Sequence, residues 1–170
     1  MIYYTSIKTQ IGNLGLVRDD YSLLRVYLPN KEISEQLLQQ IYPNENIIEN
    51  KSGFDDVANQ LTEYFNGKRK HFSIKTRMKI SPFYKKVLME VTKVPYGETT
   101  SYSQIAQKMN NPKAARVVGS ANARNPLPII IPCHRIIANN GKLGGYGGGI
   151  KMKKYLLEFE KKNLKTKKTN

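Results

Sequence analysis

Hydrophobic and polar positions alternate along much of residues 1–80, where apolar residues also recur at helical spacing. Alternation predicts strands, and apolar residues three or four positions apart predict helices. The predicted strands are 2–7, 12–18 and 21–28, and the predicted helices are 31–42 and 55–65. Since Asp19-Asp20 can turn the second strand into the third, this part predicts an α/β domain built on an antiparallel sheet.

Beyond residue 80 the pattern predicts a mainly α domain. Ser81-Pro82 and Asn111-Pro112 each put a capping side chain before a proline, which marks the first turn of a helix. The predicted helices run from 82 to the turn at 95–97, from 100 or 101 to 109, from 113 to 123 and from 151 to 162. The second and third of these form a helix-turn-helix pattern. The sequence thus predicts two domains, residues 1–80, which end in a basic connector, and residues 81–170.

The second helix of this motif is rich in Gly and Ala, and Arg116 stands out from it as a long basic side chain. Small side chains allow a helix to approach a nucleic-acid groove closely, with Arg116 as a probe. They equally allow close packing of one helix on another. The sequence leaves these two interpretations open.

The positive charge is concentrated in the second domain. Residues 1–80 hold 11 Lys and Arg against 9 Asp and Glu, a net charge of +2, whereas residues 81–170 hold 17 against 4, a net charge of +13. This excess favours a polyanionic partner, with nucleic acid first and an anionic membrane surface second. Part of it has a simpler interpretation, because five lysines among polar residues at 161–170 are typical of a disordered basic tail.

The chain has a single cysteine, Cys133, which is followed by His134 and Arg135 in an isoleucine-rich run that predicts a strand. A thiolate nucleophile needs a neighbouring base or positive charge, which these two residues could supply. A lone cysteine is also commonly a small buried apolar residue. One cysteine and two histidines exclude an internal disulfide and disfavour a structural zinc site. With no apolar run long enough for a bilayer and no signal peptide, we expect an intracellular location, the cytoplasm or a eukaryotic nucleus.

A glycine-rich loop at 144–149 surrounds one tyrosine, Tyr146. Its bare backbone N–H groups could cradle a phosphate, although the loop lacks the Lys-Ser/Thr ending of a P-loop. A base or another planar ligand fits equally well, and a flexible surface loop is the simplest alternative. The loop is therefore a candidate ligand-binding element.

Pro132-Cys133-His134-Arg135 resembles the active-site motif of the O6-alkylguanine-DNA alkyltransferases, also called methylated-DNA–protein cysteine methyltransferases. Further segments match that family in order and spacing: Ser101-Tyr102, 111–119, Asn125-Pro126, 130–135, Gly144, Tyr146, Gly148 and 156–160. The resemblance covers about residues 81–162 and implies a helix-turn-helix, alkyl-acceptor domain. Residues 1–80 resemble the family only in their α/β pattern, for which the family implies a ribonuclease-H-like fold.

The resemblance implies a chemical role for five residues. Cys133 would take the alkyl group from guanine O6, and His134 would remove the thiol proton through a bound water. Glu160 would hold the histidine from the last helix. Asn125 would fix the segment that carries the cysteine, and Tyr102 would push the target phosphate and contact the base.

The resemblance also implies that the partner is double-stranded DNA containing O6-alkylguanine, bound by a monomer that uses no metal and no cofactor. The Gly/Ala-rich helix would enter the minor groove, where Arg116 would fill the place of the flipped base. The residues expected at the DNA are Arg116, Ala114, Ala115, Gly119, Tyr102 and Arg135, and those around the base are Tyr102, Ile136, Tyr146, Gly147 and Gly148. Transfer to Cys133 would be irreversible, so that each molecule acts once, and O4-methylthymine is a second candidate substrate.

Two other functions fit parts of the sequence. A cysteine hydrolase could use Cys133 and His134 with N–H groups of the glycine-rich loop, but it would leave the helix-turn-helix unexplained. A non-catalytic DNA-binding module would need no nucleophile, and the presence of Cys133 argues against it. The sequence departs from the family at Gly147 and Gly149, where Ser or Arg is frequent, which leaves the rigidity of the loop and the breadth of substrates open.

Overall fold

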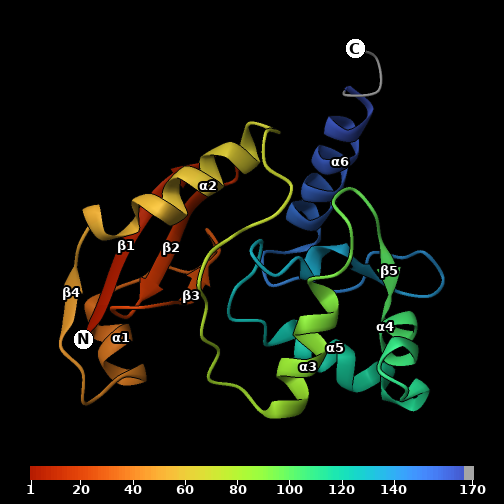
Figure 1. Cartoon of the computed structure of the whole chain (residues 1–170), viewed down its shortest axis with the longest axis horizontal. Helices are drawn as coiled ribbons and strands as arrows, with labels where there is room; N and C mark the ends of the chain where they lie inside the picture. Colours follow the sequence, from red (N-terminus) through yellow and green to blue (C-terminus); the bar gives the residue numbers. More distant parts are fainter. Residues whose placement is uncertain (167–170) are drawn as a thin grey trace. The chain divides into compact units, whose positions relative to one another are not determined.

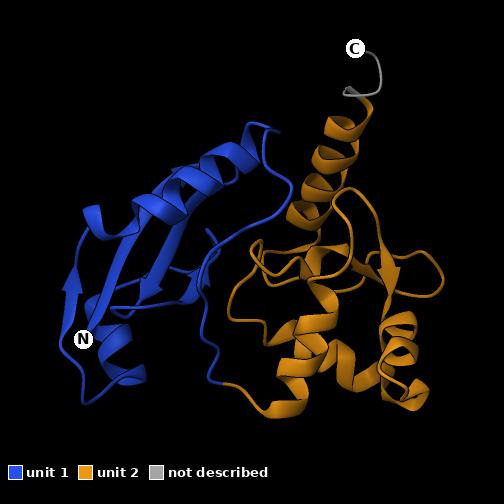
Figure 2. Cartoon of the chain, viewed as in Figure 1, with its two compact units in different colours: residues 1–79 blue, residues 80–170 orange. Residues whose placement is uncertain are grey.

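The computed structural model describes residues 1–166, and the chain divides into two compact units, Met1–Lys79 and Ile80–Asn170 (Figure 2). The strands of the first unit are β1 (Ile2–Thr9), β2 (Gly12–Arg18), β3 (Leu23–Tyr27) and β4 (Ile47–Glu49). Its helices are α1 (Glu35–Ile41) and α2 (Asp55–Phe65), with a 3₁₀ turn (Ser52–Phe54) leading into α2. The sheet has the order β3-β2-β1-β4, and β1, β2 and β3 pair antiparallel (Figure 1), so the predicted antiparallel sheet with helices is confirmed.

One strand of this sheet does not follow from the sequence pattern. β4 lies at the edge and pairs in parallel with β1, with Ile47 opposite Ile2 and Ile48 opposite Tyr3. A strand of three residues is too short to show a period of two. The alternation that identifies the longer strands therefore gives no signal here.

The inner strand β2 is buried on both of its faces. Val17 packs with four other buried residues, Ile2, Leu24, Tyr27 and Leu38. Leu14 and Leu16 are also fully buried, and because alternate residues of a strand point to opposite sides they face the other layer. α2 lies along the sheet (Figure 1) and contributes Val57, Leu61, Tyr64 and Phe65 to the buried core.

The second unit is mainly helical, as predicted, and contains the helix-turn-helix. Its elements are α3 (Pro82–Val91), β5 (Thr100–Ser101), α4 (Tyr102–Lys108), a 3₁₀ turn (Pro112–Ala114), α5 (Ala115–Ala123), a 3₁₀ turn (Cys133–Arg135), β6 (Ile136–Ile137) and α6 (Ile150–Thr166). Ser101 and Gln104 form a capping box that fixes the start of α4. β5 pairs in parallel with β6, which places the start of α4 beside the Cys133 segment.

The segment that carries Cys133 is a tight turn, so the expected strand is wrong at this point. The Cys133 N–H donates to Ile131 O at 2.8 Å within the turn. Pro128 and Pro132 have no N–H to give to a strand ladder. Ile129 has a φ of 74°, which lies outside the extended region. The chain becomes extended only at β6, directly after the turn.

α6 extends beyond its predicted end at residue 162. Residues 163–166, which we expected only in a disordered tail, continue the helix. Leu164 lies so close to the turn at Gly97 that a Cβ added to this glycine would collide with it. The rest of the expected basic tail, residues 167–170, lies outside the described residues. Within residues 1–166 no helix has both the length and the apolar character needed to cross a bilayer.

Candidate active site

Cys133 is buried at the start of its turn, and Asn125 fixes the chain that leads to it. Asn125 Nδ2 donates to Ile131 O, and Asn125 Oδ1 accepts the N–H of Leu127, both at 3.0 Å. The Asn125 side chain thus bonds to the main chain on both sides of Ile129 and stabilises the bend there. Asn125 thus orders the segment that presents the cysteine.

The surroundings of the Cys133 thiol keep it protonated at rest. Burial raises the pKa of the thiol, while a hydrogen bond with Asn125 and the positive charge of Lys153 offset part of this rise. A neutral thiol is a weak nucleophile. Reaction at this site therefore needs a base that takes the thiol proton.

Lys153 belongs to the site, although the sequence does not predict it. It is fully buried on α6, and its Nζ donates to Ile136 O at 2.6 Å and to Gly145 O at 3.3 Å. Burial lowers the pKa of Lys153 to about 8, and a charge on Cys133 acts in the opposite direction. Lys153 ties the glycine-rich loop to the chain after Cys133. Its helical spacing from the apolar Leu156 was the available signal.

His134, Arg135 and Glu160 form a buried cluster that joins the Cys133 turn to α6. Glu160 Oε1 lies 2.8 Å from His134 Nε2 and accepts from Arg135 Nη2 at 2.9 Å. Glu160 Oε2 accepts from Arg135 Nε at 2.9 Å and from the Gly97 N–H at 3.0 Å. Burial raises the pKa of Glu160, but its bonds with His134 and Arg135 outweigh burial and hold the pKa at about 2. Glu160 is therefore an ionised carboxylate held from three residues.

The ionised Glu160 determines which nitrogen of His134 carries the proton. A carboxylate only accepts hydrogen bonds, so His134 Nε2 must donate, and Nδ1 is left as the basic nitrogen. Burial lowers the pKa of His134, which the bond to Glu160 offsets only in part, so the ring is neutral at pH 7. Within the described chain, the buried Nδ1 atom has no hydrogen-bond partner. The imidazole is thus oriented and ready to accept a proton.

Arg135 is a part of this cluster, and the expectation that it contacts DNA is wrong. Only 4% of its surface is exposed. Its Nη1 donates to Val94 O at 2.7 Å, and its guanidinium carbon lies 5.5 Å from the centre of the Tyr96 ring. The sequence suggests a surface role because arginine is mostly exposed. Here the buried carboxylate of Glu160 needs a buried cation beside it.

Acid should destabilise the fold through Glu160. Its pKa is depressed in the folded state, so its contribution to the free energy of unfolding is fully present above pH 4.5 and is lost as the pH falls toward 2. The pKa difference corresponds to about 3 kcal/mol. Urea unfolding at several pH values should therefore show a steeper loss between pH 4.5 and pH 2 for the wild type than for Glu160→Gln, which cannot titrate. Equal losses would assign the acid sensitivity to other groups.

A cavity of about 310 Å³ opens beside Cys133. It is lined by Tyr102, Gly119, Asn122, Ala123, Cys133, Gly145, Tyr146 and Gly147. Of the residues expected around the base, the structure brings Tyr102, Tyr146 and Gly147 together here. Gly148, although described, lies outside the lining. Gly145 belongs to the glycine-rich loop that the sequence indicates as a ligand-binding element, whereas Asn122 and Ala123 carry no signal in the sequence.

Ile136 also lies outside the cavity lining, so its expected place around the base stays a prediction. The residue is fully buried. Its N–H donates to Cys133 O, and its carbonyl oxygen accepts from Lys153. Ile136 supports the turn because its main-chain groups bond within the protein.

Two glycines shape the environment of Tyr102. A Cβ at Gly144 would lie 2.9 Å from Tyr102 Oη, and the φ of 72° at Gly144 also favours glycine. A Cβ at Gly119 would lie 3.9 Å from Tyr102 Cδ1, which is an ordinary contact. Packing inside the protein thus requires glycine at position 144 but not at position 119.

The small residues of the helix-turn-helix do not all have the same explanation. Some pack inside the protein, and others leave room for a partner to approach. Ala114 is buried, so it packs inside the protein, and the expectation that it contacts DNA is wrong. Arg116 is exposed, and Ala115 and Gly119 are half-buried. Since Gly119 has internal room for a methyl group, close packing does not explain it. Its small size therefore favours close approach of a partner to this face.

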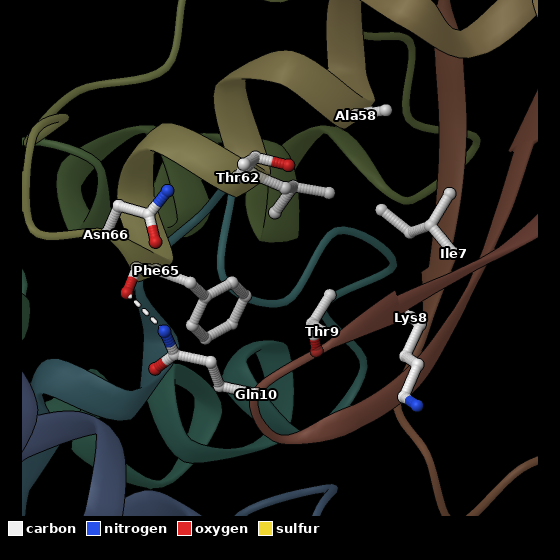
Figure 3. Close-up of a pocket in the computed structure, with 9 residues that line it drawn as sticks. Ile7, Lys8, Thr9, Gln10, Ala58, Thr62, Phe65 and Asn66 are labelled. Atoms are coloured by element: carbon white, nitrogen blue, oxygen red, sulfur yellow. Dashed lines mark hydrogen bonds between the residues drawn. The ribbon is translucent and has the colours of Figure 1, made fainter.

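A second cavity, of about 340 Å³, lies in the first unit between β1 and α2 (Figure 3). Gln10 borders it and donates a side-chain N–H to Phe65 O at 2.8 Å. Its lining residues, all within 7–66, include no Cys, His, Asp or Glu. In residues 1–166, no three His, Cys, Asp or Glu side chains are grouped as metal ligands would be.

Two family models together match most of the chain. Residues 82–162 match the 6-O-methylguanine DNA methyltransferase, DNA binding domain, and residues 2–78 match the 6-O-methylguanine DNA methyltransferase, ribonuclease-like domain. The methylated-DNA–protein-cysteine methyltransferase of Methanosarcina mazei is 42% identical over 164 residues, which covers 96% of this chain and 100% of the relative. The constitutive enzyme of the same name from Bacillus subtilis is 38% identical over 174 residues, covering 98% and 100%.

Solved structures share both units of the fold. The crystal structure of the Mycobacterium tuberculosis O6-methylguanine methyltransferase is 36% identical, with a TM-score of 0.85, and the match covers 96% of this chain and 94% of that chain. A second Mycobacterium tuberculosis structure, determined in complex with DNA, is 35% identical with a TM-score of 0.84, covering 95% and 94%. The first unit therefore has the ribonuclease-like fold that the sequence led us to expect.

Proposed function

The chain belongs to the 6-O-methylguanine DNA methyltransferase family and shares its enzyme activity, and we propose that it repairs O6-methylguanine in double-stranded DNA by moving the methyl group to Cys133. One observation carries the proposal. Cys133 lines a cavity of about 310 Å³, and the residue after it is a buried histidine whose basic nitrogen is oriented by an ionised glutamate.

The transfer is a displacement at the methyl carbon. The Cys133 thiol proton passes through a bridging water to His134 Nδ1, and Glu160 stabilises the imidazolium that forms. The Sγ–carbon bond forms as the carbon–O6 bond breaks, and the electron pair goes to guanine. Guanine takes up the proton, so that the products are S-methylcysteine and guanine. Burial raises the pKa of Tyr102, so its phenol stays protonated and can donate to the departing base.

The damaged base has to leave the duplex, because Cys133 is buried. Extruding a base requires roughly a few kcal/mol. The exposed Arg116 would enter the stack in its place, while Ala115 and Gly119 let α5 lie against the minor groove. The net charge of +13 on residues 81–170 supports binding through phosphates. One chain suffices for these steps, so we infer a monomer that acts in the compartment holding the DNA.

Arg116→Ala should slow repair in duplex DNA by about tenfold to a thousandfold, since the extruded base would no longer be replaced in the stack. Reaction with free O6-benzylguanine, which needs no extrusion, should change little. Single-turnover rates on both substrates measure the difference, and Arg116→Lys separates charge from shape. Equal losses on the two substrates would place Arg116 in folding or in general binding.

Intact-mass spectrometry tests the proposal directly. Mixing the protein with excess O6-methylguanine duplex should add one methyl group per molecule, on the peptide that contains Cys133, and undamaged duplex should add none. An O4-methylthymine duplex tests the second candidate substrate in the same way. Release of product beyond one equivalent, with an unmodified thiol, would instead support hydrolysis and overturn transfer to Cys133.

A further inference from the structure

Asn122 lines the Cys133 cavity, and its carboxamide has no hydrogen-bond partner among the described residues. It lies on α5 and lines the cavity together with Cys133. In the described part of the chain, both Asn122 Nδ2 and Asn122 Oδ1 are buried and make no hydrogen bond. A buried amide with neither end bonded is destabilising, because it gives up its bonds to water and gains none. Folding alone would favour an apolar residue at this position.

The neighbouring polar side chains do not share this property. Ser120 donates its hydroxyl to Arg116 O at 3.2 Å, and Arg124 Nη1 donates to Tyr84 Oη at 3.2 Å. Asn125, three positions further on, has both ends of its carboxamide bonded at 3.0 Å. The unbonded carboxamide is therefore specific to the residue that lines the cavity.

Tyr146 adds a second polar group of the same kind. Its hydroxyl is buried, lacks a hydrogen-bond partner within residues 1–166, and belongs to a residue of the same cavity wall. The cavity wall thus holds two residues with unbonded polar atoms, which are one hydroxyl, one carbonyl oxygen and one amino group. A ligand that fits has to present both donors and acceptors, as a nucleobase does.

We infer that Asn122 is a positioning residue that hydrogen-bonds the extruded damaged base and holds it against Cys133. This inference rests on the proposed function. The carboxamide suits the task because it gives a donor and an acceptor to one base, whereas Arg116, on the same helix, acts on the duplex. The unbonded Asn122 carboxamide lowers the stability of the free protein. Such a loss of stability is typical of a residue that serves binding.

Asn122→Leu, an apolar substitution of similar size, tests the inference. Transfer from O6-methylguanine duplex and from free O6-benzylguanine should both fall by about tenfold to a hundredfold, as expected for lost hydrogen bonds to the base. Alkylation of Cys133 by iodomethane, which needs no base contact, should stay within about twofold. The melting temperature of the free variant should rise, because the unbonded amide is gone. Ser120→Ala, whose hydroxyl is bonded elsewhere on α5, is the matched control and should leave both transfer reactions unchanged.

Three results would overturn the inference: unchanged transfer, a loss confined to duplex DNA, or a loss shared equally by iodomethane. The first removes any role, the second moves the contact to the DNA backbone, and the third indicates a structural effect on the thiol. A lower melting temperature of Asn122→Leu would also contradict it. Failure of the proposed function is distinguishable, because the wild-type protein would then not take up a methyl group at all.

Discussion

Cys133→Ser is expected to abolish methyl transfer, with a rate loss on the order of 10⁴ or more. The His134 imidazole is a weak base because burial lowers its pKa. It can take the proton of a thiol far more readily than that of an alcohol, which is much less acidic and gives a poorer nucleophile. Transfer of labelled methyl groups from O6-methylguanine duplex, followed over a single turnover, measures the loss.

DNA binding should survive this substitution. The basic residues of 81–170 are spread over several elements, whereas Cys133 is buried and its thiol is uncharged at rest. Equilibrium binding of undamaged duplex by Cys133→Ser and by the wild type should therefore agree within about twofold. Residual methyl uptake by the variant at another residue would show that Cys133 is not the acceptor.

Arg135→Met is expected to destabilise the protein by about 3–5 kcal/mol, because it leaves the buried Glu160 carboxylate without its cation. Arg135 supplies two of the hydrogen bonds to this carboxylate, at 2.9 Å each, and also holds Val94 O. Urea unfolding at neutral pH measures the change. Arg116→Met, which truncates an exposed arginine, is the matched control and should stay within about 0.5 kcal/mol.

The double variant Arg135→Met, Glu160→Gln sharpens this prediction. Removing the charge of the carboxylate together with its cation should recover part of the lost stability, so the two changes should not add. A fully stable Arg135→Met variant that has lost affinity for DNA would contradict this argument. It would restore the interpretation of Arg135 as a DNA contact.

Elements with a full period of hydrophobic residues could be predicted closely. β2 and α2 have the bounds that the pattern predicts, Gly12–Arg18 and Asp55–Phe65. The isoleucine-rich run before Cys133 shows the limit of this approach. Its composition favours a strand, but the positive φ of Ile129 and the Asn125 hydrogen bonds turn it into a bend. Such a bend depends on contacts across several residues and leaves no mark on periodicity.

The candidate site could be predicted only through the resemblance to a family. Periodicity alone does not link His134 to Glu160, which are 26 positions apart, yet the structure places them 2.8 Å apart. Arg135 is an example of a wrong prediction. A charged residue beside a nucleophile suggests a contact with an anion such as DNA, but the structure pairs Arg135 with the buried carboxylate of Glu160. Lys153 and Asn122 do not stand out in the sequence because a single polar residue on a helix is normally at the surface.

Because the chain has a single cysteine, the number of protein copies limits how many lesions a cell can repair. No second thiol in the 170 residues is available to relieve Cys133 of a methyl group. Under the proposed chemistry, the number of lesions that a cell can remove equals the number of copies it holds, whatever their rate. A burst of DNA alkylation would convert all copies to the methylated form. The capacity for repair would then return only as fast as new protein is synthesised. Tolerance to repeated exposure would then depend on gene expression, and a faster active site would not raise it.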